Sequence, residues 1–210
     1  MNGITKLNEY VSMLTFPFGE MRSHLYLIHD QDEAALIDAH VASMSEEVLE
    51  RIQEVISLDQ LKTVILTHGH MDHVGVASHL QEKTEASIAI HIADAQYIEE
   101  PWTAFLTLYE TLGITKQNYE EFQSMTGDKP VTVTQPLHHG DIVKVGSVEL
   151  QIHHTPGHSP GSICIHAWDN LSSYLLHLDM EGTFWGAKSY KSHCPDLENG
   201  IVFEIERIED

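Results

Sequence analysis

The sequence predicts a layered α/β fold in one domain that spans residues 1–210. The chain has 42% apolar residues, enough to bury a sizeable core. In its first half, short apolar runs alternate with segments of helical periodicity, as expected where helices cover a sheet. The segment 131–178 then returns to strand-like pieces separated by turns. These three observations favour a sheet-rich domain with helices packed against it.

Three strand-like pieces begin the chain in an antiparallel arrangement. They cover Tyr10–Thr15, His24–His29 and Ala34–Ile37, and the turn segments FPFGE and DQDE separate them.

A helix is predicted over Met44–Leu58. Apolar residues recur at every fourth position from Val48 to Ile56, which gives the helix one face to pack on a sheet. Ser43 and Glu46 have the spacing of a capping box, so the helix is expected to begin between them.

The strongest chemical signal follows the predicted strand Leu61–Thr67. His68, His70, Asp72 and His73 are all potential metal ligands and fall within six positions of the strand end. A polar loop is the alternative, because the chain has 16 histidines, but four ligands at this density favour a metal site. Imidazole and carboxylate suit a divalent ion such as zinc. One ion does not readily use all four.

The stretch HGHMDH that begins at His68 resembles the H-x-H-x-D-H signature of the metallo-β-lactamase superfamily. A later stretch, His154–Gly161 or HTPGHSPG, resembles the family's T-P-G-H-[ST]-x-G motif. The resemblance implies an αββα sandwich, with His158 as the third histidine ligand of the first metal. It also implies that Asp38 supports the site through hydrogen bonds. The family usually has glycine soon after this aspartate, where the chain has Ala39 and His40.

The resemblance further implies a second metal, held by Asp72 and His73. Asp179, which ends a predicted strand, would bridge the two ions. The family usually has glycine immediately before the bridging aspartate, and this chain has Leu178 there.

Between the two motifs, a helix is predicted over Asp72–Lys83 and a strand over Ser87–His91. A helical, aromatic-rich insertion then covers about 92–129. It is either a lid over a partly apolar substrate or a helical pair packed on the core. Candidate substrate-lining residues are Trp102, Phe105, Tyr109, Phe184 and Trp185.

The remaining strands are expected in the second half of the chain. The segment Val131–Gly140 is expected to form a strand and then a turn. Further strands are expected over Asp141–Val145, Ser147–His153, Ser162–Ala167 and Tyr174–Leu178. His153 and His154 are interpreted as strand-end residues, with a role at the site left open.

Relatives in the family continue for several dozen residues past the bridging aspartate to a last histidine that binds the second metal. Here only Glu181–Asp210 follow, with a helix expected over Pro195–Ile208. His193 is not expected to replace the missing ligand. We therefore expect the fold to lack its last strand and helices and the second metal to be weakly held. An open sheet edge would favour a homo-oligomer.

Composition limits the partners and the compartment. The formal charge of −21 argues against nucleic acid and anionic membranes, which need clustered Lys and Arg. Cys164 and Cys194 do not make a disulfide framework, and no signal peptide or membrane-spanning run is visible. A cytoplasmic protein acting on a small molecule is expected.

The resemblance implies a zinc-dependent hydrolase with one or two Zn²⁺ per chain, in which hydroxide generated at the metal attacks a lactone, ester or thioester. Lactones are slightly favoured, and β-lactams belong to the same set. Asp72 is a candidate catalytic residue that moves a proton to the leaving group. Two alternatives remain: an oxidoreductase similar to the mononuclear iron persulfide dioxygenases, or an inactive, truncated relative.

Overall fold

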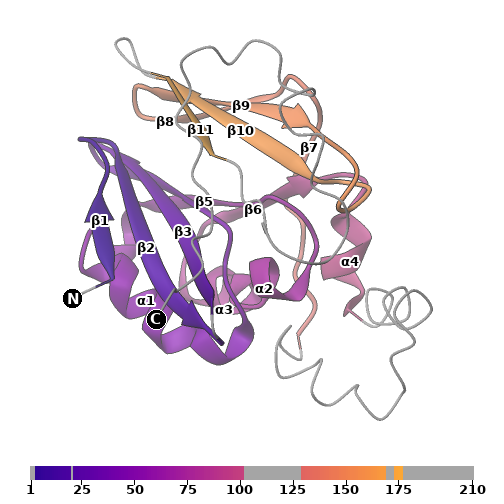
Figure 1. Cartoon of the computed structure of the whole chain (residues 1–210), viewed down its shortest axis with the longest axis horizontal. Helices are drawn as coiled ribbons and strands as arrows, with labels where there is room; N and C mark the ends of the chain where they lie inside the picture. Colours follow the sequence, from indigo (N-terminus) through magenta and orange to yellow (C-terminus); the bar gives the residue numbers. More distant parts are fainter. Residues whose placement is uncertain (1–2, 20, 102–128, 169–172, 177–210) are drawn as a thin grey trace.

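The computed structural model describes residues 3–19, 21–101, 129–168 and 173–176, which form two facing β-sheets (Figure 1). The first sheet has the order β1-β2-β3-β4-β5-β6-β7. Its strands are β1 (Ile4–Lys6), β2 (Val11–Phe18), β3 (Met21–Asp30), β4 (Glu33–Ile37), β5 (Leu61–Leu66), β6 (Ser87–His91) and β7 (Gln135–Leu137). The second sheet has the order β11-β10-β9-β8. Its strands are β8 (Ile142–Val145), β9 (Val148–His154), β10 (Ile163–Trp168) and β11 (Ser173–Leu176).

Helices cover the outer face of the first sheet, where α1 and α3 lie in Figure 1. The helices of the described residues are α1 (Ser45–Gln53), α2 (Met71–Val74), α3 (Ala77–Lys83) and α4 (Ala95–Glu99), with short 3-10 helices η1 (Ala42–Met44) and η2 (Leu58–Gln60). None of these helices has the length and apolar character needed to cross a membrane. The predicted α/β sandwich is confirmed.

The first sheet changes direction at β4. Strands β1 to β4 pair antiparallel, as the sequence predicted for the start of the chain, and β4 to β7 pair parallel. Strand β1 was not predicted. Strand β2 continues to Phe18, through residues that the sequence assigned to a turn. Strand β7 covers only part of the segment Val131–Gly140, which the sequence predicted to be a strand followed by a turn.

Two apolar layers hold the sandwich together. Val64 and Leu66 of β5 belong to the cluster shared with α1 and α3, whereas Ile65 belongs to the cluster between the two sheets. All three side chains are fully buried. This two-sided burial explains why β5 reads as a continuous apolar run instead of an alternating one.

The capping box predicted from Ser43 and Glu46 is wrong. The residue before α1 is Met44, which makes no side-chain cap, and the Ser45 hydroxyl donates instead to the carbonyl oxygen of Ala42. A capping box does occur at η2, between Ser57 and Gln60. The Ser-x-x-Glu pattern failed because η1 already occupies the turn where the cap was expected.

The single helix predicted over Asp72–Lys83 is divided into α2 and α3. The break lies at Gly75 and Val76, whose N–H groups donate to the carbonyl oxygens of His40 and Ala39 at 2.7 and 3.0 Å. These hydrogen bonds replace those of a continuous helix. The loop after β4 is thereby attached to the segment that carries His73, whose carbonyl oxygen accepts from the Ala39 N–H at 2.7 Å.

Several predicted features lie outside the described residues. They are Asp179, the helix Pro195–Ile208, most of the insertion 92–129, and the aromatic residues Trp102, Phe105, Tyr109, Phe184 and Trp185.

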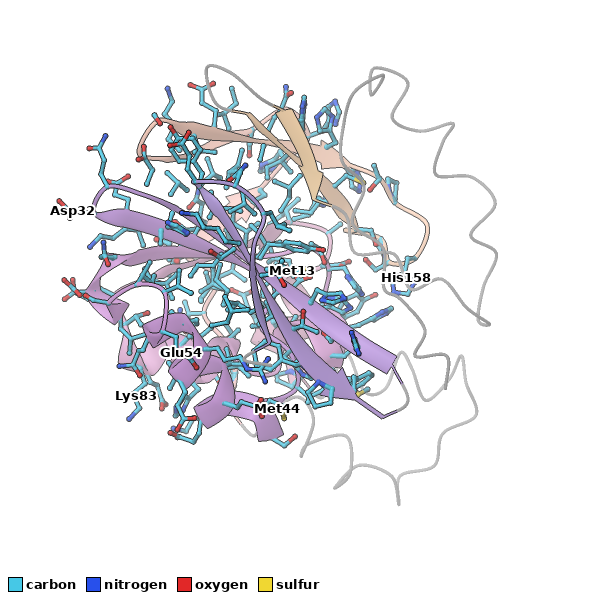
Figure 2. All side chains as sticks on the ribbon, turned by 60° about the vertical axis from the view of Figure 1, so that its left-hand side comes forward. Met13, Asp32, Met44, Glu54, Lys83 and His158 are labelled. Atoms are coloured by element: carbon cyan, nitrogen blue, oxygen red, sulfur yellow. The ribbon has the colours of Figure 1, made fainter. Side chains whose placement is uncertain are left out.

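The two sheets are joined by hydrogen bonds at one end of the sandwich. Asp30, at the end of β3, accepts from the N–H of Ser147, and Glu33 accepts from the N–H of Gly146. Gly146 has a φ of 56°, and a Cβ there would lie 2.5 Å from a carboxylate oxygen of Asp30. Figure 2 shows Asp32, in the same β3–β4 turn, at the opposite end of the molecule from His158.

Replacing Gly146 with alanine should destabilise the protein more than replacing Gly19. Both glycines have positive φ, 56° and 60°, so each change costs about 1–2 kcal/mol of backbone strain. Nothing lies within 4 Å of a Cβ at Gly19, whereas Gly146→Ala must also displace Asp30. Urea unfolding of G146A and G19A measures the difference. Equal losses would contradict a close contact between the sheets at Gly146.

Candidate metal centre

The candidate centre lies where parallel strands end side by side. Ile37 pairs with Ile65, so β4 and β5 finish at the same level, followed by Asp38 and Thr67. In open α/β sheets the carboxyl ends of the strands are the usual place for a ligand. The loop after β5 carries the predicted ligands, and the loop between β9 and β10 brings His158 beside them.

Three predicted ligands converge. The Nε2 atom of His158 lies 3.1 Å from Nε2 of His68 and 2.9 Å from Nδ1 of His70. One nitrogen from each ring lies within 4.8 Å of the others, which is compatible with a single ion held by all three. His68 is buried, His70 is half-buried and His158 is exposed, so the group opens to solvent on the side of His158. Among the described residues this is the one cluster of at least three potential ligands.

Asp38 is fully buried and orients two histidines. Its carboxylate accepts from the Thr67 N–H at 2.7 Å and the Thr67 hydroxyl at 2.9 Å, and it lies 2.9 Å from Nδ1 of His73. Since the Thr67 hydroxyl donates to Asp38, it accepts from Nδ1 of His68, 3.1 Å away. The lone pair of His68 is therefore on Nε2, the atom that faces His158. The support expected of Asp38 thus acts on both rings.

Asp72 and His73 lie together beside the three-histidine cluster. The Nε2 atom of His73 lies 3.4 Å from a carboxylate oxygen of Asp72. These residues offer two ligand atoms for the predicted second metal, and the third predicted ligand, Asp179, lies outside the described residues.

Burial and charge separate the pKa values of these groups. Burial, reinforced by His158, lowers the pKa of His70 to about 4. His158 is exposed as a residue, but neighbouring atoms partly desolvate its ring, and this desolvation and then His73 lower its pKa. Burial opposes the charged form of His73 too, but Asp72 and Asp38 outweigh it and raise its pKa to about 10. In return, His73 outweighs burial at Asp72 and holds that pKa far below its usual range.

The lowered pKa values of His70 and His158 are compatible with metal binding by these two rings. His70 and His158 are neutral near pH 7, and a neutral imidazole is the form that binds a metal. The raised pKa of His73 favours its protonated form, which Asp72 and Asp38 stabilise on either side.

A further carboxylate, Asp94, was missed from the sequence. It is fully buried and accepts hydrogen bonds from the N–H of Gly69, the hydroxyl of Ser159 and the N–H of Gly161. It follows the end of β6 by three residues, in the same position relative to the sheet as the other site residues. The rule that ligand sites form at the ends of parallel strands could have identified it.

His154 has a structural role near the centre. It ends β9, as predicted, and its Nε2–H donates to the carbonyl oxygen of Pro160 at 2.9 Å. Its ring stacks on His91 with centroids 3.8 Å apart. These contacts hold the loop that carries His158 against the end of β6.

The comparisons with known proteins agree with this geometry. A family model described as "Metallo-beta-lactamase superfamily" matches residues 19–169, so the chain belongs to this superfamily. It is similar to "Probable metallo-hydrolase YybB" of Bacillus subtilis, with 27% identity over 76% of this chain and 64% of the relative. It is also similar to "Hydroxyacylglutathione hydrolase GloC" of Haemophilus influenzae, with 31% identity over 64% of this chain and 55% of the relative.

A metallo-beta-lactamase of Cronobacter sakazakii shares the fold, with a TM-score of 0.67 and 17% identity over 88% of this chain and 65% of that structure. The chain spans less than two thirds of the length of all three proteins.

Asp38→Ala should lower the free energy of unfolding by about 3–5 kcal/mol, because it leaves a charged, buried His73 without one of its two carboxylates. Thr67→Val is the matched control: it keeps the amide that donates to Asp38 and should cost only about 1–2 kcal/mol. Urea unfolding with a chelator present measures both. If T67V cost as much as D38A, Asp38 would not be the central acceptor.

His40 should make the free energy of unfolding depend on pH. Its backbone has a φ of 50°, which glycine adopts most easily, and its buried ring meets the edges of Phe16 and Phe18. Burial, which Asp72 only partly offsets, lowers the pKa of His40 to about 4. The unfolded chain, with a histidine pKa near 6.5, therefore binds more protons between these values.

The stability that neutral His40 contributes is therefore complete above pH 6.5 and is lost as the pH falls towards 4, by up to about 3 kcal/mol. His40→Asn, which tolerates positive φ, should flatten this part of the profile. Urea unfolding across this range, with a chelator present, measures the slope. Identical slopes in H40N and the parent would show that His40 does not titrate on unfolding.

Proposed function

We propose that the protein is a metal-dependent hydrolase in which His68, His70 and His158 hold a Zn²⁺ ion. The observation that carries the proposal is the convergence of one nitrogen from each ring within 4.8 Å. Three histidines with solvent on the remaining side are the donor set of catalytic zinc sites. Membership of the superfamily supports the same assignment.

When bound, zinc would activate water at near-neutral pH and polarise the scissile carbonyl group. The proposed roles of the surrounding residues are to orient a ligand and to transfer a proton. Asp38 and Thr67 hold His68 with its Nε2 lone pair towards the ion. Asp72, ionised beside the three histidines, is the group proposed to carry a proton to the leaving group.

We also propose a second metal ion at this centre. Asp72 and His73 supply two adjacent ligand atoms, and Asp179 is proposed to bridge. We propose that this second ion is bound more weakly than the first.

For the substrate we propose a small lactone, ester or thioester. A thioester has direct support from a relative, since GloC is named a hydroxyacylglutathione hydrolase. The slight preference for lactones came from the sequence alone, so both classes belong in the first assay panel together with β-lactams.

The proposal predicts that a chelator abolishes hydrolysis and that added Zn²⁺ restores it. His158→Ala should lower kcat/KM by at least about 10-fold, since loss of a ligand should cost no less than loss of a group that supports one. His138→Ala is the matched control, because that histidine is mostly exposed and lies near Asp141 instead of the cluster. Rates on the lactone, thioester and β-lactam panel measure both variants.

Metal analysis of the purified protein distinguishes the alternatives. Two tightly bound zinc ions per chain would contradict weak binding at the second site. Iron, with oxygen uptake on a persulfide, would replace the hydrolase by a dioxygenase. Hydrolysis that is unchanged in His68→Ala would exclude the proposed centre.

A further inference from the structure

The loops that carry the three histidines are joined by a buried carboxylate. Gly69 lies between His68 and His70, and its N–H donates to Oδ2 of Asp94 at 2.9 Å. On the other loop, next to His158, the Ser159 hydroxyl donates to the same oxygen at 2.5 Å. These loops are far apart in the sequence. Within the described residues, Asp94 therefore bonds directly to both of them.

The Asp94 carboxylate is the acceptor in each of these hydrogen bonds. The Gly161 N–H donates to Oδ1 at 2.6 Å, so both carboxylate oxygens act as acceptors. Since the Ser159 hydroxyl donates to Asp94, the Ser162 hydroxyl, 2.8 Å away, must donate to Ser159. An amide in place of the carboxylate would turn an NH₂ group towards one of these donors. The site thus requires an acid at this position.

Glycines let both ligand loops pack closely against Asp94 and α4. A Cβ at Gly161 would lie 2.6 Å from Cγ of Asp94, and a Cβ at Gly69 would lie 2.8 Å from Cδ2 of Tyr97. Asp94 also directly precedes α4, a position where aspartate often caps a helix, yet it makes no side-chain cap. Its carboxylate oxygens accept hydrogen bonds from the two ligand loops instead of from the first turn of α4.

We propose that Asp94 is a positioning residue that sets the spacing between the His68–His70 pair and His158, and so determines how tightly the centre binds its metal. The inference rests on the proposed metal site. Groups that fix ligand orientation from outside the ligand set contribute substantially to metal affinity in protein sites. Here the carboxylate accepts from two backbone N–H groups and one hydroxyl beside the ligands, and none of these hydrogen bonds involves a histidine ring.

The test is the affinity of the full chain for Zn²⁺, measured by competition with a chelating dye, beside urea unfolding of the metal-free protein. Asp94→Asn should weaken Zn²⁺ binding about 10–100-fold. Ser159→Ala should weaken it less, because the two amide hydrogen bonds remain. The double variant should bind no more weakly than Asp94→Asn alone, since both changes break one shared interaction.

Asp30→Asn is the matched control. Asp30 also accepts from a backbone N–H across two loops, but it lies beside Asp32, at the far end of the sandwich from His158. We expect Asp30→Asn to lower the stability only, so the Zn²⁺ affinity of this variant should stay at the parental value. The absorption spectrum of the Co²⁺-loaded protein adds a readout of ligand geometry, which should change in D94N and not in D30N.

Each outcome has one meaning. Parental Zn²⁺ affinity in folded D94N overturns the inference, and so does an equal loss of affinity in D30N. If D94N does not fold, S159A decides, and parental affinity there overturns the inference. A parent chain that binds no Zn²⁺ refutes the proposed metal site itself, which is a different result from a parent that binds well and a D94N that binds equally well.

Discussion

The burial of the Asp38 carboxylate at the end of β4 is the constraint around which the candidate centre forms. A carboxylate without exposure to water is costly unless donors surround it. Thr67 supplies an N–H and a hydroxyl, and His73 supplies the ring nitrogen Nδ1. The raised pKa of His73 favours the form in which this nitrogen carries a proton. Each donor comes from the segment that follows β5. Satisfying Asp38 therefore places the start of the HGHMDH stretch and fixes the tautomer of His68.

Hydrogen bonds from the backbone extend this constraint. The loop after β4 accepts from Gly75 and Val76 and donates to the carbonyl oxygen of His73. The segment carrying Asp72 and His73 is thus held on both sides, by the Asp38 side chain and by the chain that follows it. The cost is a divided helix and a histidine at positive φ, His40. Local irregularity of this kind is common where a site is held in place.

The sequence was sufficient for features that depend on local pattern. Continuous apolar runs predicted β5 and β6 because both faces of these strands are buried, and the density of ligands predicted a centre at the end of β5. The resemblance then identified His158, which lies 90 positions beyond His68 yet only 3.1 Å from it.

Features that depend on tertiary hydrogen bonds were not predictable in the same way. The helix at Asp72–Lys83 has a sound apolar face, with Ala77 and Leu80 buried, but its periodicity carries no sign of acceptors from the loop after β4. The capping pattern at Ser43 failed because a 3-10 turn took its place. Asp94 follows the end of a parallel strand, but the sequence does not show its partners, because they lie on two other loops that only the folded chain brings together.

At each end of the sandwich an aspartate accepts a hydrogen bond from a backbone N–H group, but the consequences differ. Asp30 accepts a backbone N–H between loops in contact with solvent, where water can replace a lost partner. Asp94 does so in full burial, where a lost acceptor leaves donors unsatisfied. A turn far from the centre can therefore vary at small cost. The loops that carry His68, His70 and His158 cannot separate without exposing Asp94 or leaving it unpaired, so the geometry of the centre is tied to the stability of its surroundings.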